Sequence, residues 1–170
     1  MSKPIRVSGI IPESIVDGPG IRFVLFVQGC PHHCPGCHNP DTHDFSGGYD
    51  MTPEQVLERI KSQPVFGVTL SGGEPFSQSE ALLPLAEEIK KLGKHLMIYT
   101  GFTYEQLTAR TDKATHALLG LADVLVDGPF LQEQKSLSLR FRGSANQRVI
   151  DLPQTLRTGQ VVISPYAVRE

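Results

Sequence analysis

The feature that most constrains this chain is a group of three cysteines in one short segment. They are the only cysteines among its 170 residues, and the segment reads Cys30-Pro31-His32-His33-Cys34-Pro35-Gly36-Cys37. An iron–sulfur cubane normally takes four cysteine thiolates, one for each iron. A [4Fe–4S] cluster held by Cys30, Cys34 and Cys37 would therefore keep one iron free to bind a substrate or a cofactor.

Two other uses of these cysteines fit the loop less well. A closed zinc site could combine them with His32, His33 or His38, but the ligands of structural zinc usually come as two separated pairs. A disulfide would leave one thiol unpaired, and nothing in the chain suggests secretion. An open cluster is thus the preferred interpretation, and a zinc-binding interaction module is the alternative.

Composition and charge narrow the class of protein further. Hydrophobic residues make up 39% of the chain and charged residues 20%, which indicates one globular domain over residues 1–170. The net charge of −2 argues against a nucleic-acid partner. The N-terminus lacks the apolar region of a signal peptide, and no apolar run approaches the roughly 20 residues of a membrane helix. We therefore expect a cytoplasmic protein with no membrane partner, in a reducing compartment that suits thiolate ligands.

Apolar stretches and helix signals alternate along the chain. Strands are expected at 21–28, 65–70, 95–99, 124–126, 148–152 and 161–163, with no helix between the last two. Helices are expected at 52–61, 79–92 and 103–119. Thr52 and Thr103 each start a capping box, and Pro84 predicts a late start or a kink in the second helix.

Alternating strands and helices predict an α/β fold with a parallel sheet and right-handed crossovers. The chain is too short for eight strand–helix units, so we expect an open, partial (β/α) barrel. The special residues follow strands: the cysteines in loop 29–40, then Gly72-Gly73-Glu74, Thr100-Gly101 and Asp127. In parallel α/β folds this edge of the sheet is where ligands bind.

Three motifs beside the cysteines make the sequence similar to the radical S-adenosylmethionine (SAM) enzymes, and within them to the activating enzymes of glycyl-radical proteins. The segment Asp17-Gly18-Pro19-Gly20-Ile21-Arg22 precedes the first strand, and Asn39-Pro40 follows the third cysteine. The block Gly72-Gly73-Glu74-Pro75 follows the second strand. The radical SAM type of partial barrel is the fold that this resemblance implies.

The resemblance implies two cofactors, a [4Fe–4S] cluster on Cys30, Cys34 and Cys37 and SAM chelated to its free iron. One electron from the cluster then cleaves SAM to a 5′-deoxyadenosyl radical, and no protein side chain is needed as an acid, base or nucleophile. The residues implied to contact SAM are Gly36, Cys37, His38, Gly72, Gly73, Glu74 and Asp127. A simple turn at Gly72-Gly73 and a helix or turn cap at Asp127 are the alternatives.

The segment Arg142-Gly143-Ser144-Ala145-Asn146-Gln147-Arg148 resembles a signature of the proteins that activate anaerobic ribonucleotide reductase. This implies an oxidoreductase that abstracts hydrogen from a glycine of the large reductase subunit. It also implies a low-potential electron donor such as a flavodoxin or ferredoxin. Activation of pyruvate formate-lyase or another glycyl-radical enzyme is the alternative, because the early region is similar there too. Residues 142–148 are expected to recognise the partner's glycine loop, or else to close the barrel edge or contact SAM.

Overall fold

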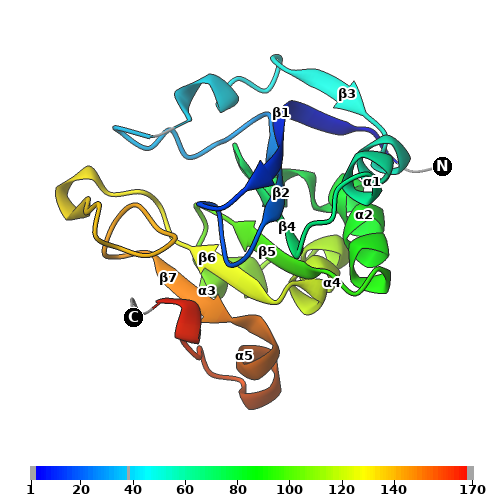
Figure 1. Ribbon diagram of the computed structural model, residues 1–170. Coiled ribbons are helices and arrows are strands. Elements are labelled where there is room, and N and C mark those ends of the chain that lie inside the picture. The colour runs from blue at the N-terminus through cyan, green and yellow to red at the C-terminus, as the bar shows by residue number, and fades with distance from the viewer. Residues whose placement is uncertain (1–2, 38, 168–170) are drawn as a thin grey trace.

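One mixed sheet organises the computed structural model, which describes residues 3–37 and 39–167 (Figure 1). Its strand order is β3-β1-β2-β4-β5-β6-β7. The strands are β1 (Ile5–Ser14), β2 (Arg22–Val27), β3 (Tyr49–Met51), β4 (Gly67–Gly72), β5 (His95–Tyr99), β6 (Val124–Asp127) and β7 (Arg148–Asp151). The central strands β2, β4, β5 and β6 are parallel, whereas β1, β3 and β7 are antiparallel to their neighbours. Strands β3 and β7 lie at opposite edges and do not pair with each other, so the sheet is open, and the expectation of an open α/β fold with parallel strands is confirmed.

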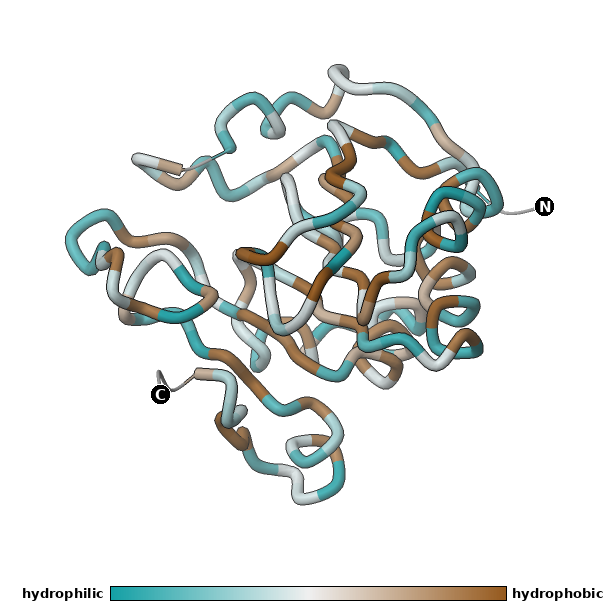
Figure 2. The backbone as a smooth tube through the Cα atoms, viewed as in Figure 1, coloured by the Kyte–Doolittle hydropathy of each residue, from teal (hydrophilic) through white to brown (hydrophobic). Residues whose placement is uncertain are grey.

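The helices lie together on one side of the sheet (Figure 1). They are α1 (Pro53–Lys61), α2 (Ser79–Lys91), α3 (Tyr104–Thr108), α4 (Lys113–Leu121) and α5 (Leu152–Thr158). Their apolar side chains and those of the strands form the main hydrophobic core. Figure 2 shows the same concentration of hydrophobic chain along the central strands. No helix in the described part of the chain has both the length and the hydrophobicity needed to cross a bilayer.

Both predicted capping boxes are present. The hydroxyls of Thr52 and Thr103 accept hydrogen bonds from the backbone N–H of Gln55 and Gln106, each at 3.1 Å. Pro84 does not delay the helix that contains it, because α2 begins at Ser79.

Three expectations about secondary structure were wrong. The helical stretch 103–119 is two helices, because the Asp112 side chain accepts from Thr115 N–H and starts α4 separately. A helix, α5, does follow β7, capped by Asp151, which accepts from Gln154 N–H at 3.0 Å. Finally, Ile163 makes only an isolated bridge with Ile150 and does not belong to a strand. The strands β1 and β3 were not anticipated.

The other face of the sheet carries a smaller apolar cluster and one buried cation. The Arg22 side chain is fully buried. It donates to Thr69 Oγ1 at 2.7 Å, to Pro19 O at 2.9 Å and to Val68 O at 2.8 Å. Desolvation lowers its pKa to about 10, so it stays charged at neutral pH. Arg22 therefore fixes the loop before β2 against β4, which gives the Gly-x-Gly-x-Arg motif a structural role.

The pKa of His95 yields a prediction about stability. Burial, followed by the nearby charge of Arg22, lowers this pKa from 6.5 to about 4. Between these two pH values the unfolded chain therefore binds more protons than the folded protein. The contribution of neutral His95 to the free energy of unfolding is complete above pH 6.5 and is lost as the pH falls toward 4. At a pH of about 5.5 the loss is about 1 kcal/mol. We expect urea unfolding at about pH 7.5 and 5.5 to show this effect. The difference in the free energy of unfolding between the two pH values should be smaller by this amount in His95→Gln than in the parent. Equal pH dependence in the two proteins would contradict this assignment.

Candidate functional site

The cysteine loop follows β2 and folds back on the segment that leads to β3. Cys30 is buried, whereas Cys34 and Cys37 are partly exposed. The backbone N–H of Gly29 donates to Thr42 O at 2.6 Å, and that of Cys30 donates to His43 O at 3.1 Å. These contacts hold the first cysteine firmly at the end of β2, while the other two lie farther out on the loop.

A cavity of about 730 Å³ joins this loop to the other strand ends, and its volume lies in the usual range for ligand sites. The residues that bring the predicted motifs to its wall are Cys30, Cys34, Cys37, Gly72, Gly73, Thr100, Gly101, Arg142, Gly143 and Gln147. The parallel strands thus bring together residues that lie as far apart as 30 and 147 in the sequence. Figure 1 shows the two long loops, the cysteine loop and 128–147, on the same side of the molecule.

The donor set at this cavity fits an iron–sulfur cluster. Three thiols line one cavity, and the backbone N–H of Asn39 donates to Cys37 Sγ at 3.4 Å, a contact that stabilises a thiolate ligand. Desolvation raises the pKa of the Cys30 thiol, so binding of a metal at this sulfur must release its proton. Within residues 3–37 and 39–167, no three Cys, His, Asp or Glu side chains are already arranged as a metal site.

Gly72 packs directly against the backbone of β2, and Gly73 packs against the backbone of the cysteine loop. Gly72 has φ +106°, and a Cβ on Gly73 would lie 2.3 Å from Gly29 O. The backbone N–H groups of Gly73 and Glu74 donate to Val27 O and Gly29 O at 2.9 and 2.8 Å. Close approach of two protein segments therefore requires these glycines. The predicted contact with SAM agrees with their place in the cavity wall but remains a prediction.

Glu74 lies beneath the cavity wall. Its carboxylate is fully buried and accepts from Thr100 Oγ1 at 2.7 Å, Gly101 N–H at 2.8 Å and Phe76 N–H at 3.1 Å. His32 Nε2 lies 2.5 Å from Glu74 Oε1. His32 was considered above only as a ligand of the alternative zinc site, although its place between two cysteines was a signal that it lies at the candidate site. Direct contact of Glu74 with SAM remains a prediction, since the described contacts of its carboxylate are with protein groups.

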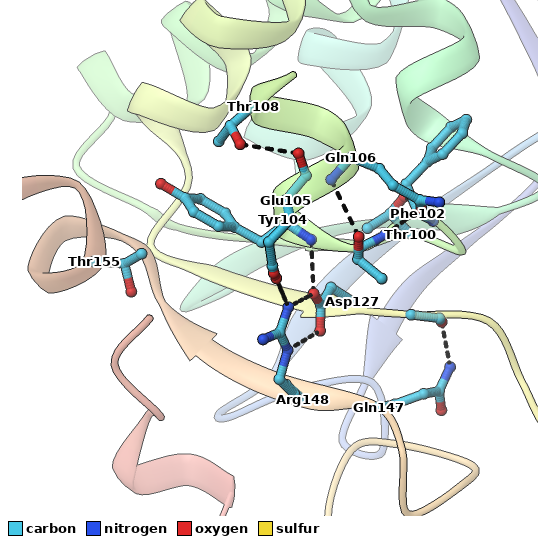
Figure 3. A network of polar contacts seen from close by, with 12 residues as sticks. Thr100, Phe102, Tyr104, Glu105, Gln106, Thr108, Asp127, Gln147, Arg148 and Thr155 are labelled. Atoms are coloured by element: carbon cyan, nitrogen blue, oxygen red, sulfur yellow. Dashed lines mark hydrogen bonds and ion pairs between the residues drawn. The ribbon is translucent and has the colours of Figure 1, made fainter. Parts of the chain in front are cut away.

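Asp127 belongs to a different polar network, which Figure 3 shows. Its buried carboxylate accepts from Arg148 Nε at 3.0 Å and from the N–H of Tyr104, the first residue of α3, at 2.8 Å. Arg148 also pairs with Glu105, and the hydrogen bond to Asp127 is the main cause of its raised pKa. Asp127 thus joins β7 to the start of α3, whose N-cap residue is Thr103. Its contact with SAM remains a prediction.

The last two predicted SAM contacts lie beside Cys37. Gly36 has φ +73°, and a Cβ there would meet the Gln132 side chain at 3.0 Å, so the cysteine loop touches the 128–147 loop at this point. His38 lies outside the described residues.

The signature segment 142–148 shapes the 128–147 loop from within. Gln147 Oε1 accepts from Gly143 N–H at 2.9 Å. Gln147 Nε2 donates to Gly128 O at 3.1 Å, the hydrogen bond drawn at Gln147 in Figure 3. Asn146 Nδ2 donates to Pro129 O at 2.7 Å, and Arg142 Nη1 donates to Gln147 O at 2.8 Å. The amide side chains therefore hold the loop in shape, while Arg142 lines the cavity.

Comparison with known proteins agrees with this site. Residues 16–150 match the model of the 4Fe-4S single cluster domain, which defines the class as an iron–sulfur protein. The anaerobic ribonucleoside-triphosphate reductase-activating protein of Haemophilus influenzae is 39% identical over 145 residues, which are 80% of this chain and 91% of that protein. The chain belongs to this family of activating proteins. Membership confirms the assignment to radical SAM oxidoreductases, with a [4Fe–4S] cluster and SAM as cofactors.

Two further proteins are similar over smaller parts of the chain. The pyruvate formate-lyase-activating enzyme of Clostridium pasteurianum is 41% identical over 117 residues, which are 63% of this chain and 49% of that enzyme. The crystal structure of QueE from Escherichia coli has a TM-score of 0.47 at 21% identity and covers 59% of this chain and 54% of its own.

Proposed function

We propose that this protein generates the glycyl radical of the large subunit of an anaerobic ribonucleotide reductase. The observation that carries the proposal is one cavity lined by all three cysteines, by Gly72-Gly73 and by the signature segment. When bound, the cluster and SAM supply a 5′-deoxyadenosyl radical that can abstract hydrogen from a glycine. A low-potential flavodoxin or ferredoxin reduces the cluster, and the reaction takes place in anaerobic cytoplasm.

The protein's own residues hold and orient these groups in the proposal. Cys30, Cys34 and Cys37 bind the cluster. Gly36, His38, Gly72 and Gly73 contact SAM along the backbone of the two loops. Glu74 and Asp127 lie near SAM in the proposal. Their hydrogen bonds with the N–H groups of Gly101 and Tyr104 support a role in fixing the loops around SAM.

The test is to mix anaerobically reconstituted protein with SAM, dithionite and a candidate partner, and to record electron paramagnetic resonance (EPR) spectra. A glycyl radical is expected on the reductase and not on pyruvate formate-lyase. The reverse result would favour the alternative, to which the clostridial relative points. Protein that holds stoichiometric zinc and shows no SAM binding would instead indicate the zinc module.

Arg142 provides a variant that separates partner recognition from SAM cleavage. Its Nε is buried without a hydrogen-bond partner among the described residues, and a peptide carbonyl at the cavity wall would satisfy it. In Arg142→Ala, SAM cleavage without reductase should persist while glycyl-radical yield falls about tenfold. Arg157→Ala, on α5, is the control. Equal loss of both activities would assign Arg142 to SAM binding or folding. Asn146 and Gln147 suit this test less well, because their amides join the segment to Pro129 and Gly128 at the start of the loop, whereas Arg142 Nη1 bonds within the segment, to Gln147 O.

A further inference from the structure

His32 belongs to the cysteine loop, and its imidazole contacts the residues that follow β5. Besides its contact with Glu74, its ring meets Phe102 edge-on, with 4.5 Å between ring centroids. A Cβ on Gly101 would lie 2.4 Å from His32 Cδ2, so glycine at 101 makes room for the ring. This side chain is only 15% exposed, although it belongs to a loop that is largely exposed.

The carboxylate that His32 contacts joins three segments of the chain. Glu74 Oε1 is shared by His32 and Gly101 N–H, whereas Oε2 accepts from Thr100 Oγ1 and Phe76 N–H. A buried carboxylate with this many partners has little freedom to move, because each lost contact would leave a buried polar group unpaired. Glu74 is therefore a fixed point against which the cysteine loop can be held.

The cysteine loop is attached to this fixed point at two positions. The backbone is attached at Gly29, whose carbonyl accepts from Glu74 N–H at 2.8 Å. The side chain of His32 makes the second attachment, midway between Cys30 and Cys34. Two attachments to Glu74 fix both the position and the direction of the loop relative to Gly72-Gly73. The other contacts of the loop, from Cys30 and His33 to His43 and from Gly36 to Gln132, are with segments other than Glu74.

We infer that His32 is a positioning residue that, through Glu74, holds the cysteine loop at the correct distance from Gly72-Gly73. The inference rests on the proposed function, in which the loop carries the cluster and the two glycines contact SAM. His32 is not a cluster ligand in this assignment. Its loss should leave the cluster in place but should weaken the binding of SAM to it.

The experiment compares His32→Ala with His32→Gln, whose amide N–H can still donate to Glu74 Oε1. His33→Asn is the matched control, because His33 is the exposed neighbour on the same loop and asparagine tolerates its φ of +49°. Each protein is reconstituted anaerobically, and its iron content is measured. The EPR spectrum of the reduced cluster is then titrated with SAM. Iron content should match the parent in all three variants. The spectral change caused by SAM should need about tenfold more SAM in His32→Ala, and His32→Gln should recover most of the loss.

A second measurement does not depend on either cofactor. Hydrogen–deuterium exchange of the cluster-free proteins should be faster at residues 31–37 and 100–102 in His32→Ala than in the parent or in His33→Asn. Parent-like exchange and parent-like SAM titration in His32→Ala would overturn the inference. Equal loss of iron in the alanine and glutamine variants would also overturn it, because His32 would then be a ligand. A parent protein that binds neither iron nor SAM would refute the proposed function, and the exchange data would still decide whether His32 holds the loop.

Discussion

Single replacement of Cys30, Cys34 or Cys37 by alanine should abolish both cluster binding and SAM cleavage. The anaerobically purified parent should be brown and carry about four irons per chain. With two thiolates left, a second iron loses its protein ligand. Iron and sulfide assays with visible absorption spectra measure the loss, which should be nearly complete in each variant.

Pro35→Ala is the matched control for the cysteine variants, since Pro35 is an exposed residue of the same loop and offers no ligand atom. It should keep the iron content of the parent. Full iron content in any of the three cysteine variants would contradict the assignment of that residue. Stoichiometric zinc without visible absorption in the parent would contradict the cluster altogether.

Gly73→Val should remove most of the iron as well as SAM cleavage, each by at least about tenfold. The Cβ would lie 2.3 Å from Gly29 O and 3.0 Å from Thr42 O, and backbone atoms cannot move aside as a flexible side chain can. The cysteine loop must therefore shift, and such overpacking typically costs about 1–3 kcal/mol of stability. Iron content and SAM cleavage are measured on the same preparation.

Gly120→Ala is the control for this substitution, because a Cβ there meets nothing within 4 Å. It should bind iron and cleave SAM as the parent does. A Gly73→Val protein with full iron content but no SAM binding would show that approach of SAM, and not packing of the loop, requires the glycine. A variant that keeps both properties would remove Gly73 from the site.

The sequence predicted the parts of the fold that depend on local signals. The capping boxes at Thr52 and Thr103 and the central parallel strands follow from neighbouring residues. Strand β1, which lies between β3 and β2, was missed because its burial depends on pairing with both of them, which no local pattern reveals. The helix α5 was missed although Asp151 and Gly159 were available as its cap signals.

The sequence predicted which residues form the candidate site better than it predicted what each of them does. The order of strands brings Cys30 and Gly73 to one cavity, as the positions after strand ends predicted. The partners of Glu74 and Asp127 could not be read from the sequence. Glu74 meets His32, which is 42 positions away, and Asp127 meets Arg148, which is 21 positions away. Such contacts depend on the packing of separate loops, so a carboxylate that the sequence places next to a ligand site can already have all its hydrogen bonds from the protein.

The open sheet has a consequence for how wide the entrance to the cavity can become. In a closed barrel the rim is a ring of hydrogen-bonded strands, and widening it means breaking strand pairs. Here the 128–147 loop forms one wall, and Gln147 and Asn146 stiffen it from within. The contacts that hold this loop to β5 and to the residues after it include the hydrogen bonds from Tyr99 Oη to Phe141 O at 2.7 Å and from Gly128 N–H to Phe102 O at 2.8 Å. Phe141 also packs against the smaller apolar cluster. Moving this wall would break these loop contacts but no pair between the named strands, so the width of the entrance depends on the 128–147 loop and not on the sheet.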